Sequence, residues 1–176
     1  MRLARIGGGI FCFCIALLGA SDASAQIYME TVGPAIQGDA AAAGYENQIV
    51  LDSGQWGVGS VPCGGGGLSV SEFTVSKSAD RATVDLLSAI QSGTIFTEIV
   101  VRYVTADGGG GLIDYQTYRF KSAALTSYST SSGGGRPSES LSIYFSEVEI
   151  EYVHIDSKGG LSPETMTLTT PACSAF

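Results

Sequence analysis

The sequence has little histidine and little positive charge. His154 is the only histidine, and 9 lysine and arginine residues stand against 17 aspartate and glutamate residues, a net charge of −8. Such an acidic chain repels nucleic-acid phosphates, so we expect no nucleic-acid partner. A single imidazole also excludes mechanisms and metal sites that need two histidines. We predict no catalytic residue, no metal ligand and no cofactor, and we expect that the protein is not an enzyme.

Proline is scarce, with 5 residues, whereas glycine occurs 24 times in 176 residues. Because 44% of the residues are hydrophobic and only 15% are charged, the composition is that of a folded chain. Glycine-rich segments at 64–67, 108–111 and 131–137 lie between stretches of alternating apolar residues. None continues into the Gly-Lys-Ser or Gly-Lys-Thr of a phosphate-binding loop, so they predict turns between strands.

No apolar run reaches the roughly 20 residues that a membrane-spanning helix needs. The run at 6–18 follows Arg2 and Arg5, and small residues at 23–25 come after it. This arrangement is typical of a secretory signal peptide, here residues 1–25. We therefore expect export to the periplasm or beyond, and a mature chain, 26–176, that forms a single domain without membrane insertion.

The mature chain has only two cysteines, Cys63 and Cys173, because Cys12 and Cys14 fall within the apolar run. Export places this pair in an oxidising compartment, where two cysteines most simply form one disulfide. The alternative is two free buried thiols.

The period of two that is typical of β-strands dominates the mature chain. Leu68 and Val70 change phase with Phe73 and Val75 near Glu72, which suggests a bend. The predicted strands are residues 27–32, 47–58, 68–75, 95–105, 115–120, 123–129, 139–153 and 164–170, the last a weak edge strand.

One helix is predicted after Asp80, which can cap it, and Gly93 lies where a helix often ends. Its apolar residues recur at helical spacing: Ala82, Leu86, Ala89 and Ile90. The fold class is therefore mainly β, a small barrel or tight sandwich of antiparallel strands with one α-helix.

The strand at 139–153 switches its apolar face midway, as a strand shared by two sheets can do. Glu147, Glu149 and Glu151 alternate along its second half. Since a strand does not converge its side chains on one point, we interpret these carboxylates as a solvated acidic face rather than a calcium or acid–base site.

Several segments, in order, resemble the haemolysin-coregulated protein (Hcp) family, the tube protein of type VI secretion. The third of them contains Ser53, Trp56 and Gly57, similar to the family's serine–tryptophan–glycine strand. The resemblance covers about 27–154 and rests on residues 27–30, 36–39, 53–57, 73–77, 80–82, 86–93, 118–120, 127–129, 131–139 and 145–152. It implies a β-barrel with one helix, six copies of which form a ring that stacks into a tube, holds small effectors in its lumen and lies under a spike protein.

Our leading hypothesis is therefore an exported, ring-forming structural subunit with itself as its main partner. The alternative is an exported binding or interaction module that works without a contractile apparatus. We expect the alanine- and glycine-rich loop 34–47 to bury little on its own barrel and so to reach a neighbouring subunit. The predicted interface positions are Asp39, Ala41, Gly44 and Tyr45.

Overall fold

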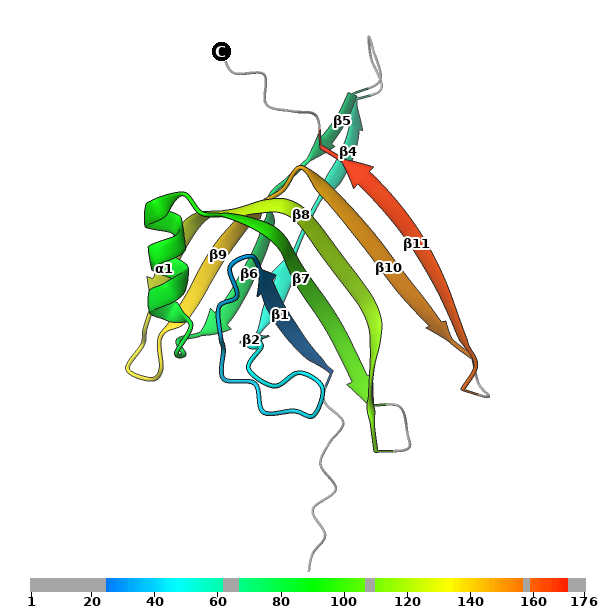
Figure 1. The fold of residues 1–176 in the computed structure, drawn as a ribbon, viewed down its shortest axis with the longest axis horizontal. Helices are drawn as coiled ribbons and strands as arrows, with labels where there is room; N and C mark the ends of the chain where they lie inside the picture. The colour runs from blue at the N-terminus through cyan, green and yellow to red at the C-terminus, as the bar shows by residue number, and fades with distance from the viewer. Residues whose placement is uncertain (1–24, 62–66, 107–109, 157–158, 171–176) are drawn as a thin grey trace, which may run out of the picture.

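A nine-stranded antiparallel sheet curls around an apolar core in the computed structural model (Figure 1). The structure describes residues 25–61, 67–106, 110–156 and 159–170. Along the main path of the sheet the order is β2 (Ile49–Leu51), β1 (Gln26–Val32), β7 (Ile95–Ala106), β8 (Leu112–Ser131), β9 (Ser138–Tyr144), β6 (Phe73–Ser78) and β3 (Ser53–Gln55). Off this path, β10 (Glu147–Ile155) and β11 (Leu161–Thr169) form a projecting arm, and β4 (Val58–Val61) and β5 (Gly67–Val70) form a separate hairpin.

The two ends of the main path, β2 and β3, are consecutive segments of the chain. Asp52 joins them, and its backbone N–H donates to the Ser76 carbonyl of β6 at 2.8 Å. The sheet therefore curls like a barrel. At the seam, its two end strands are joined by Asp52 of the chain and not by hydrogen bonds between paired strands. The predicted fold class is confirmed, but the single strand predicted at 47–58 is wrong, because this stretch turns at the seam and is divided into three strands.

Strand β8 is the longest element and pairs along one edge with both β9 and β10. Its residues 124–131 face β9 and its residues 116–121 face β10. The outer edges then diverge, since β9 pairs with β6 and β10 pairs with β11. The single strand predicted at 139–153 is wrong, because the chain breaks at Phe145 and Ser146 into β9 and β10, which pair with different parts of β8 in the same sheet. The two strands predicted at 115–120 and 123–129 are one, with Ser122 at a φ of 46° between them.

The helix α1 (Thr83–Ser92) covers one end of the curled sheet, as predicted. The Asp80 carboxylate accepts a hydrogen bond from the Ala82 N–H at 2.9 Å, which satisfies a backbone donor before the first turn. Gly93 ends the helix at a φ of 64°, a left-handed conformation that glycine adopts without steric cost. Leu86 and Ala89 are buried against the core.

The core fills the inside of the curl with aromatic and branched side chains. Its largest fully buried apolar members are Phe73, Phe96, Phe120, Phe145, Met29, Ile49, Leu86, Ile99, Leu141 and Ile143. Within the described residues, every buried side-chain nitrogen and oxygen has a hydrogen-bond partner.

The loop at 34–47 folds back over β1 and β7 (Figure 1). Tyr45 stacks on Tyr28 with ring centroids 4.6 Å apart, and Ala40 and Val104 complete this second small apolar cluster. The expectation that the loop buries little on its own barrel is therefore wrong for Ala40 and Tyr45. Tyr28 and Val104 lie on the sheet face that points away from the main core, so they need a cover that the loop provides.

Candidate interaction surfaces

Three of the four predicted interface positions are accessible. Asp39, Ala41 and Gly44 are exposed, and the Asp39 carboxylate lies 3.7 Å from the Arg81 guanidinium. Tyr45 is buried, and its hydroxyl donates a hydrogen bond to Asp114. Burial and then this hydrogen bond raise the pKa of Tyr45 far above its ordinary value. The Tyr45 side chain thus belongs to the subunit's own fold, while the other three positions stay predictions.

The β10–β11 arm extends on the side of the molecule opposite to α1 (Figure 1). We define the arm face as Ile150, Tyr152, Met166 and Leu168, which continue the sheet face of the buried Val148 and Phe120. Ile150 lies opposite Met166 in the ladder, and Tyr152 and Met166 are 47% and 57% exposed. Among the described strands, β11 pairs only with β10, so the arm offers an open backbone edge and a face that is apolar except for Glu164, which lies opposite Tyr152.

The opposite face of the arm carries both carboxylates and cations. Lys121 of β8 lies 2.7 Å from Glu147 and 3.8 Å from Glu149, and Arg119 lies 3.9 Å from Glu149. The hydrogen bond to Glu147 raises the pKa of Lys121 above its ordinary value. The alternation of the carboxylates is as predicted, but the interpretation as a simple acidic face is wrong for Glu147 and Glu149, because β8 places Lys121 and Arg119 opposite them, whereas Glu151 lies opposite Thr117.

A buried charged network joins β6, β9 and the start of α1. The Lys77 ammonium lies 2.7 Å from both Glu139 and Asp80, and it donates to the Ser78 carbonyl at 2.9 Å. The other Glu139 oxygen accepts hydrogen bonds from the hydroxyls of Thr83 at 2.8 Å and Tyr128 at 3.0 Å.

Lys77 and Glu139 are 0% and 2% exposed. Burial works against the ionised Glu139 carboxylate, but the hydrogen bonds from Lys77, Thr83 and Tyr128 outweigh it and hold its pKa below the ordinary value. The sequence analysis assigned this network no role. The signal was present, because Lys77 continues the alternation of Phe73 and Val75 and so falls on the core face.

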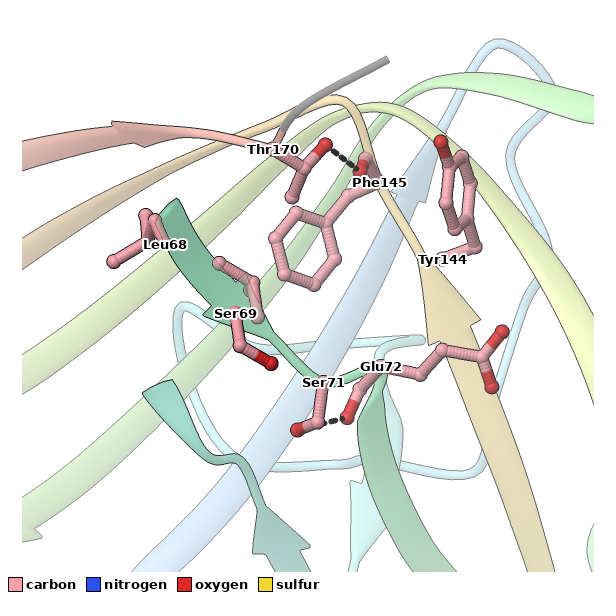
Figure 2. Close-up of a pocket in the computed structure, with 8 residues that line it drawn as sticks. Leu68, Ser69, Ser71, Glu72, Tyr144, Phe145 and Thr170 are labelled. Atoms are coloured by element: carbon pink, nitrogen blue, oxygen red, sulfur yellow. Dashed lines mark hydrogen bonds between the residues drawn. The ribbon is translucent and has the colours of Figure 1, made fainter. Parts of the chain in front are cut away.

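A pocket of about 530 Å³ lies where the β4–β5 hairpin meets the corner between β9 and β10. Leu68 and Val70 line it from β5, and the Phe145 side chain points into the space between β5 and Thr170 (Figure 2). The Thr170 hydroxyl donates to the Phe145 carbonyl at 2.9 Å. Trp56 packs behind this corner, with its indole N–H 3.1 Å from the Ser71 carbonyl.

Other predicted features have fewer contacts or fall outside the described residues. His154 is exposed near the end of β10. Within the described residues, no three histidine, cysteine, aspartate or glutamate side chains gather into a group that could hold a metal ion. Cys63, Cys173 and residues 1–24 lie outside the described part of the chain, so the disulfide and the signal peptide stay predictions. The described chain contains no helix with the length and hydropathy of a membrane span.

A curled antiparallel sheet, one helix in the described part of the chain and two projecting hairpins place the protein among small β proteins, with strand edges, loops and apolar faces open to other chains. The chain matches the model of the family described as "Type VI secretion system effector, Hcp" over residues 28–152. The chain therefore belongs to the Hcp family, as its sequence resemblance predicted, and is a protein of the type VI secretion class. No curated protein sequence matches it.

Solved structures agree with this assignment. The chain is similar to a structure titled as a type six secretion system protein, with a TM-score of 0.69 and 26% identity over 82% of this chain and 96% of that one. Hcp1 from Salmonella typhimurium gives a TM-score of 0.68 and 25% identity over 82% and 94%. The secreted protein Hcp3 from Pseudomonas aeruginosa, at 14% identity over 85% and 100%, shares the fold with a TM-score of 0.65.

Proposed function

We propose that this Hcp-family chain is a structural subunit that closes into a homo-oligomeric ring, most simply of six copies, outside the cytoplasm. The observation that carries the proposal is the arm. Its apolar face holds Tyr152 and Met166, each about half exposed, and the free edge of β11 lies beside them. An apolar sheet face that continues a core outward is a surface that another chain covers.

The position of the arm suits a head-to-tail contact. The arm and α1 lie on opposite sides of the molecule, so one subunit can extend its arm over the next without using the same surface twice (Figure 1). A heterologous contact repeated by rotation closes into a ring. Asp39, Ala41 and Gly44, at the exposed surface of the 34–47 loop, provide a second contact in this proposal.

The partners in this proposal are other copies of the chain, with small effectors in the lumen and a spike protein at the end of a stack. In this proposal the cargo lies against a face on which Glu147 and Glu149 are paired with cations of β8. Export through the signal peptide at 1–25 and a Cys63–Cys173 disulfide complete the proposal.

Native mass spectrometry of the mature protein tests the ring. Met166→Glu places a charge on the exposed arm face, so we expect a closed oligomer for the wild type and monomers for this variant. Gln91→Glu adds the same charge on the exposed surface of α1 and should leave the oligomer intact. A strictly monomeric wild type at high micromolar concentration would contradict the ring and favour the binding-module alternative.

A further inference from the structure

The open edge of β11 presents a row of backbone groups beside the arm face. Next to the end of this strand, the N–H of Thr170 donates to the carbonyl of Ser146, just before β10, at 2.9 Å. Because the N–H and C=O groups of an antiparallel strand alternate in direction, the even-numbered residues of β11 bond to β10 and the odd-numbered residues face the open side. The backbone groups of Thr165, Thr167 and Thr169 therefore point away from β10, and all three residues are exposed.

Pro163 limits the part of this edge that another strand can use. It also faces the open side, so its missing N–H removes no hydrogen bond to β10. It does remove a donor from the open edge, and at the other end β11 stops at Thr169. The usable edge therefore runs from Thr165 to Thr169, with Thr167 at its centre.

This usable edge lacks the features that normally protect a strand from pairing. Its sequence, Thr-Met-Thr-Leu-Thr, contains no charged residue and no proline, and its ladder with β10 has no bulge. Threonine, which is β-branched, also favours the extended backbone of a strand. Among the described strands, the others with a single partner are β2, β3, β4 and β5, each three or four residues long. A second β11 therefore matches the length of this edge best.

The usable edge is also self-complementary. Read in either direction, threonine alternates with a large apolar residue. In an antiparallel pair centred on Thr167, Thr165 lies opposite Thr169 of the second copy, and Met166 lies opposite Leu168 of the second copy. The two Thr167 residues meet on the two-fold axis. A two-fold interface requires such self-complementarity, because both subunits contribute the same surface.

Charge does not oppose this pairing. In the same register Glu164, the only charged residue of β11, lies opposite Thr170 of the second copy. On the other face, Glu149 lies beside Thr167 in the ladder, so the Glu149 residues of the two copies are three strand spacings apart, about 14 Å. This separation exceeds the ~8 Å over which exposed charges interact at physiological ionic strength.

We propose that two copies of the chain pair through β11, antiparallel and centred on Thr167, so that their two arms form one continuous sheet. Thr165, Thr167 and Thr169 each exchange hydrogen bonds with the residue opposite, and Met166 packs against Leu168 of the second copy. The ring proposed above uses the face of the arm, whereas this contact uses its edge. The inference therefore goes beyond the ring and does not depend on it.

Engineered cysteines test the register in the mature chain. In C63S/C173S/T167C the added cysteine is the only thiol. Opposite residues that exchange hydrogen bonds have Cα atoms about 5.5 Å apart, within the range of a disulfide, so oxidation should give a linked dimer. In the matched control C63S/C173S/T165C, the cysteines of the two copies lie about 14 Å apart, so this variant should stay unlinked. T165C/T169C in the same background should link again, because each cysteine lies opposite the other position.

Thr167→Pro tests the backbone hydrogen bonds. The Thr167 N–H faces the open side, so proline removes no hydrogen bond to β10 and should leave the circular dichroism spectrum intact. In the T165C/T169C background, this change should slow formation of the linked dimer by about tenfold or more, because each copy loses a hydrogen bond. Thr167→Val keeps the N–H and a β-branched side chain, so this control should not slow the linkage.

Linkage of T165C as readily as T167C, or linkage of neither, would overturn the inference. Equal rates for Thr167→Pro and Thr167→Val would also overturn it. Native mass spectrometry of the same proteins separates this contact from the ring. A closed oligomer that does not link through T167C contradicts the edge pairing alone, and a linked dimer without a closed oligomer contradicts the ring alone.

Discussion

Glu139 is a buried carboxylate whose charge is stabilised by its neighbours, and this gives the protein a specific acid sensitivity. Its pKa is lowered in the folded state, so its ionised form stabilises the protein above the ordinary carboxyl pKa. That contribution is lost as the pH falls below the ordinary value and through the lowered one. Replacing one partner of a buried charged pair lowers the free energy of unfolding, because the remaining buried charge has fewer partners.

We expect Glu139→Gln to lower the free energy of unfolding at pH 7 by about 1–3 kcal/mol. The amide oxygen of this variant can still accept hydrogen bonds from Thr83 and Tyr128, and Lys77 keeps Asp80, so the variant should fold. The difference from the wild type should shrink as the pH falls from 5 to 3, because the wild-type carboxyl becomes neutral. Urea denaturation across this pH range measures the difference in the free energy of unfolding.

Glu147→Gln is the control, because Glu147 is a partly exposed partner of Lys121. This variant should lower the free energy of unfolding by less than about 1 kcal/mol. A difference that stays constant with pH would contradict the prediction.

Strand alternation in the sequence predicts that Lys77 and Glu139 each point to the core, but it does not predict that they contact each other. Phe73, Val75 and Lys77 share one face, and Glu139, Leu141 and Ile143 share another, by simple alternation. Lys77 lies directly opposite Glu139 because of the register between β6 and β9. In the chain these two strands are separated by α1, β7 and β8. Pairing of distant strands is not encoded in either strand alone.

Among the elements, the 34–47 loop is tied to the start of β2 through Gly38. The Gly38 N–H donates to the Asn47 carbonyl at 2.7 Å, and a Cβ at this position would lie 2.4 Å from both the Gln48 oxygen and the Ile49 Cα. These are backbone atoms that cannot move aside. Gly38→Ala should therefore displace the loop from the sheet and cost about 1–3 kcal/mol.

Hydrogen exchange of residues 34–47 and of Tyr45 in particular measures this displacement, together with chemical denaturation. Gly133→Ala is the matched control, because a Cβ there would meet no atom within 4 Å. Equal stability of the two variants, with unchanged exchange in the loop, would show that the close approach at Gly38 is not required.

The element boundaries show where periodicity succeeds and where it fails. The helix was predictable because its apolar spacing and Gly93 at its end are local signals, but the N-cap position is Ala82, without a capping side chain, and not the predicted Asp80. The division of 47–58 was not, because it reflects the seam at Asp52, where the chain passes from one sheet edge to the other. The cover that Tyr45 gives to Tyr28 was also missed, since an alanine- and glycine-rich loop shows no periodicity that would mark a buried side.

At the scale of the whole molecule, the proposed export has a direct chemical signature. Protein isolated from the native host should begin at Gln26, and non-reducing peptide mapping should find Cys63 linked to Cys173. Reduction of this long-range bridge should lower the free energy of unfolding by about 4–5 kcal/mol in the chain-entropy model while the β-rich fold is kept. Intact mass spectrometry and denaturation with and without reductant check both parts. A chain that keeps residues 1–25, or free thiols in freshly exported protein, would contradict the export proposal.

The pairing of β1 has a consequence for the order of folding. Strand β1 pairs with β7, and Tyr28 lies opposite Arg102. During synthesis β1 can therefore form this pairing only after α1 and most of β7 have been made. Pairing of residues so distant in sequence is slow, because the chain between them has to be ordered first. The neighbouring strands β7, β8 and β9 can instead nucleate the structure from local hairpins. A chain of this topology therefore completes its sheet only late in its synthesis, after β7, β8 and β9 have been made.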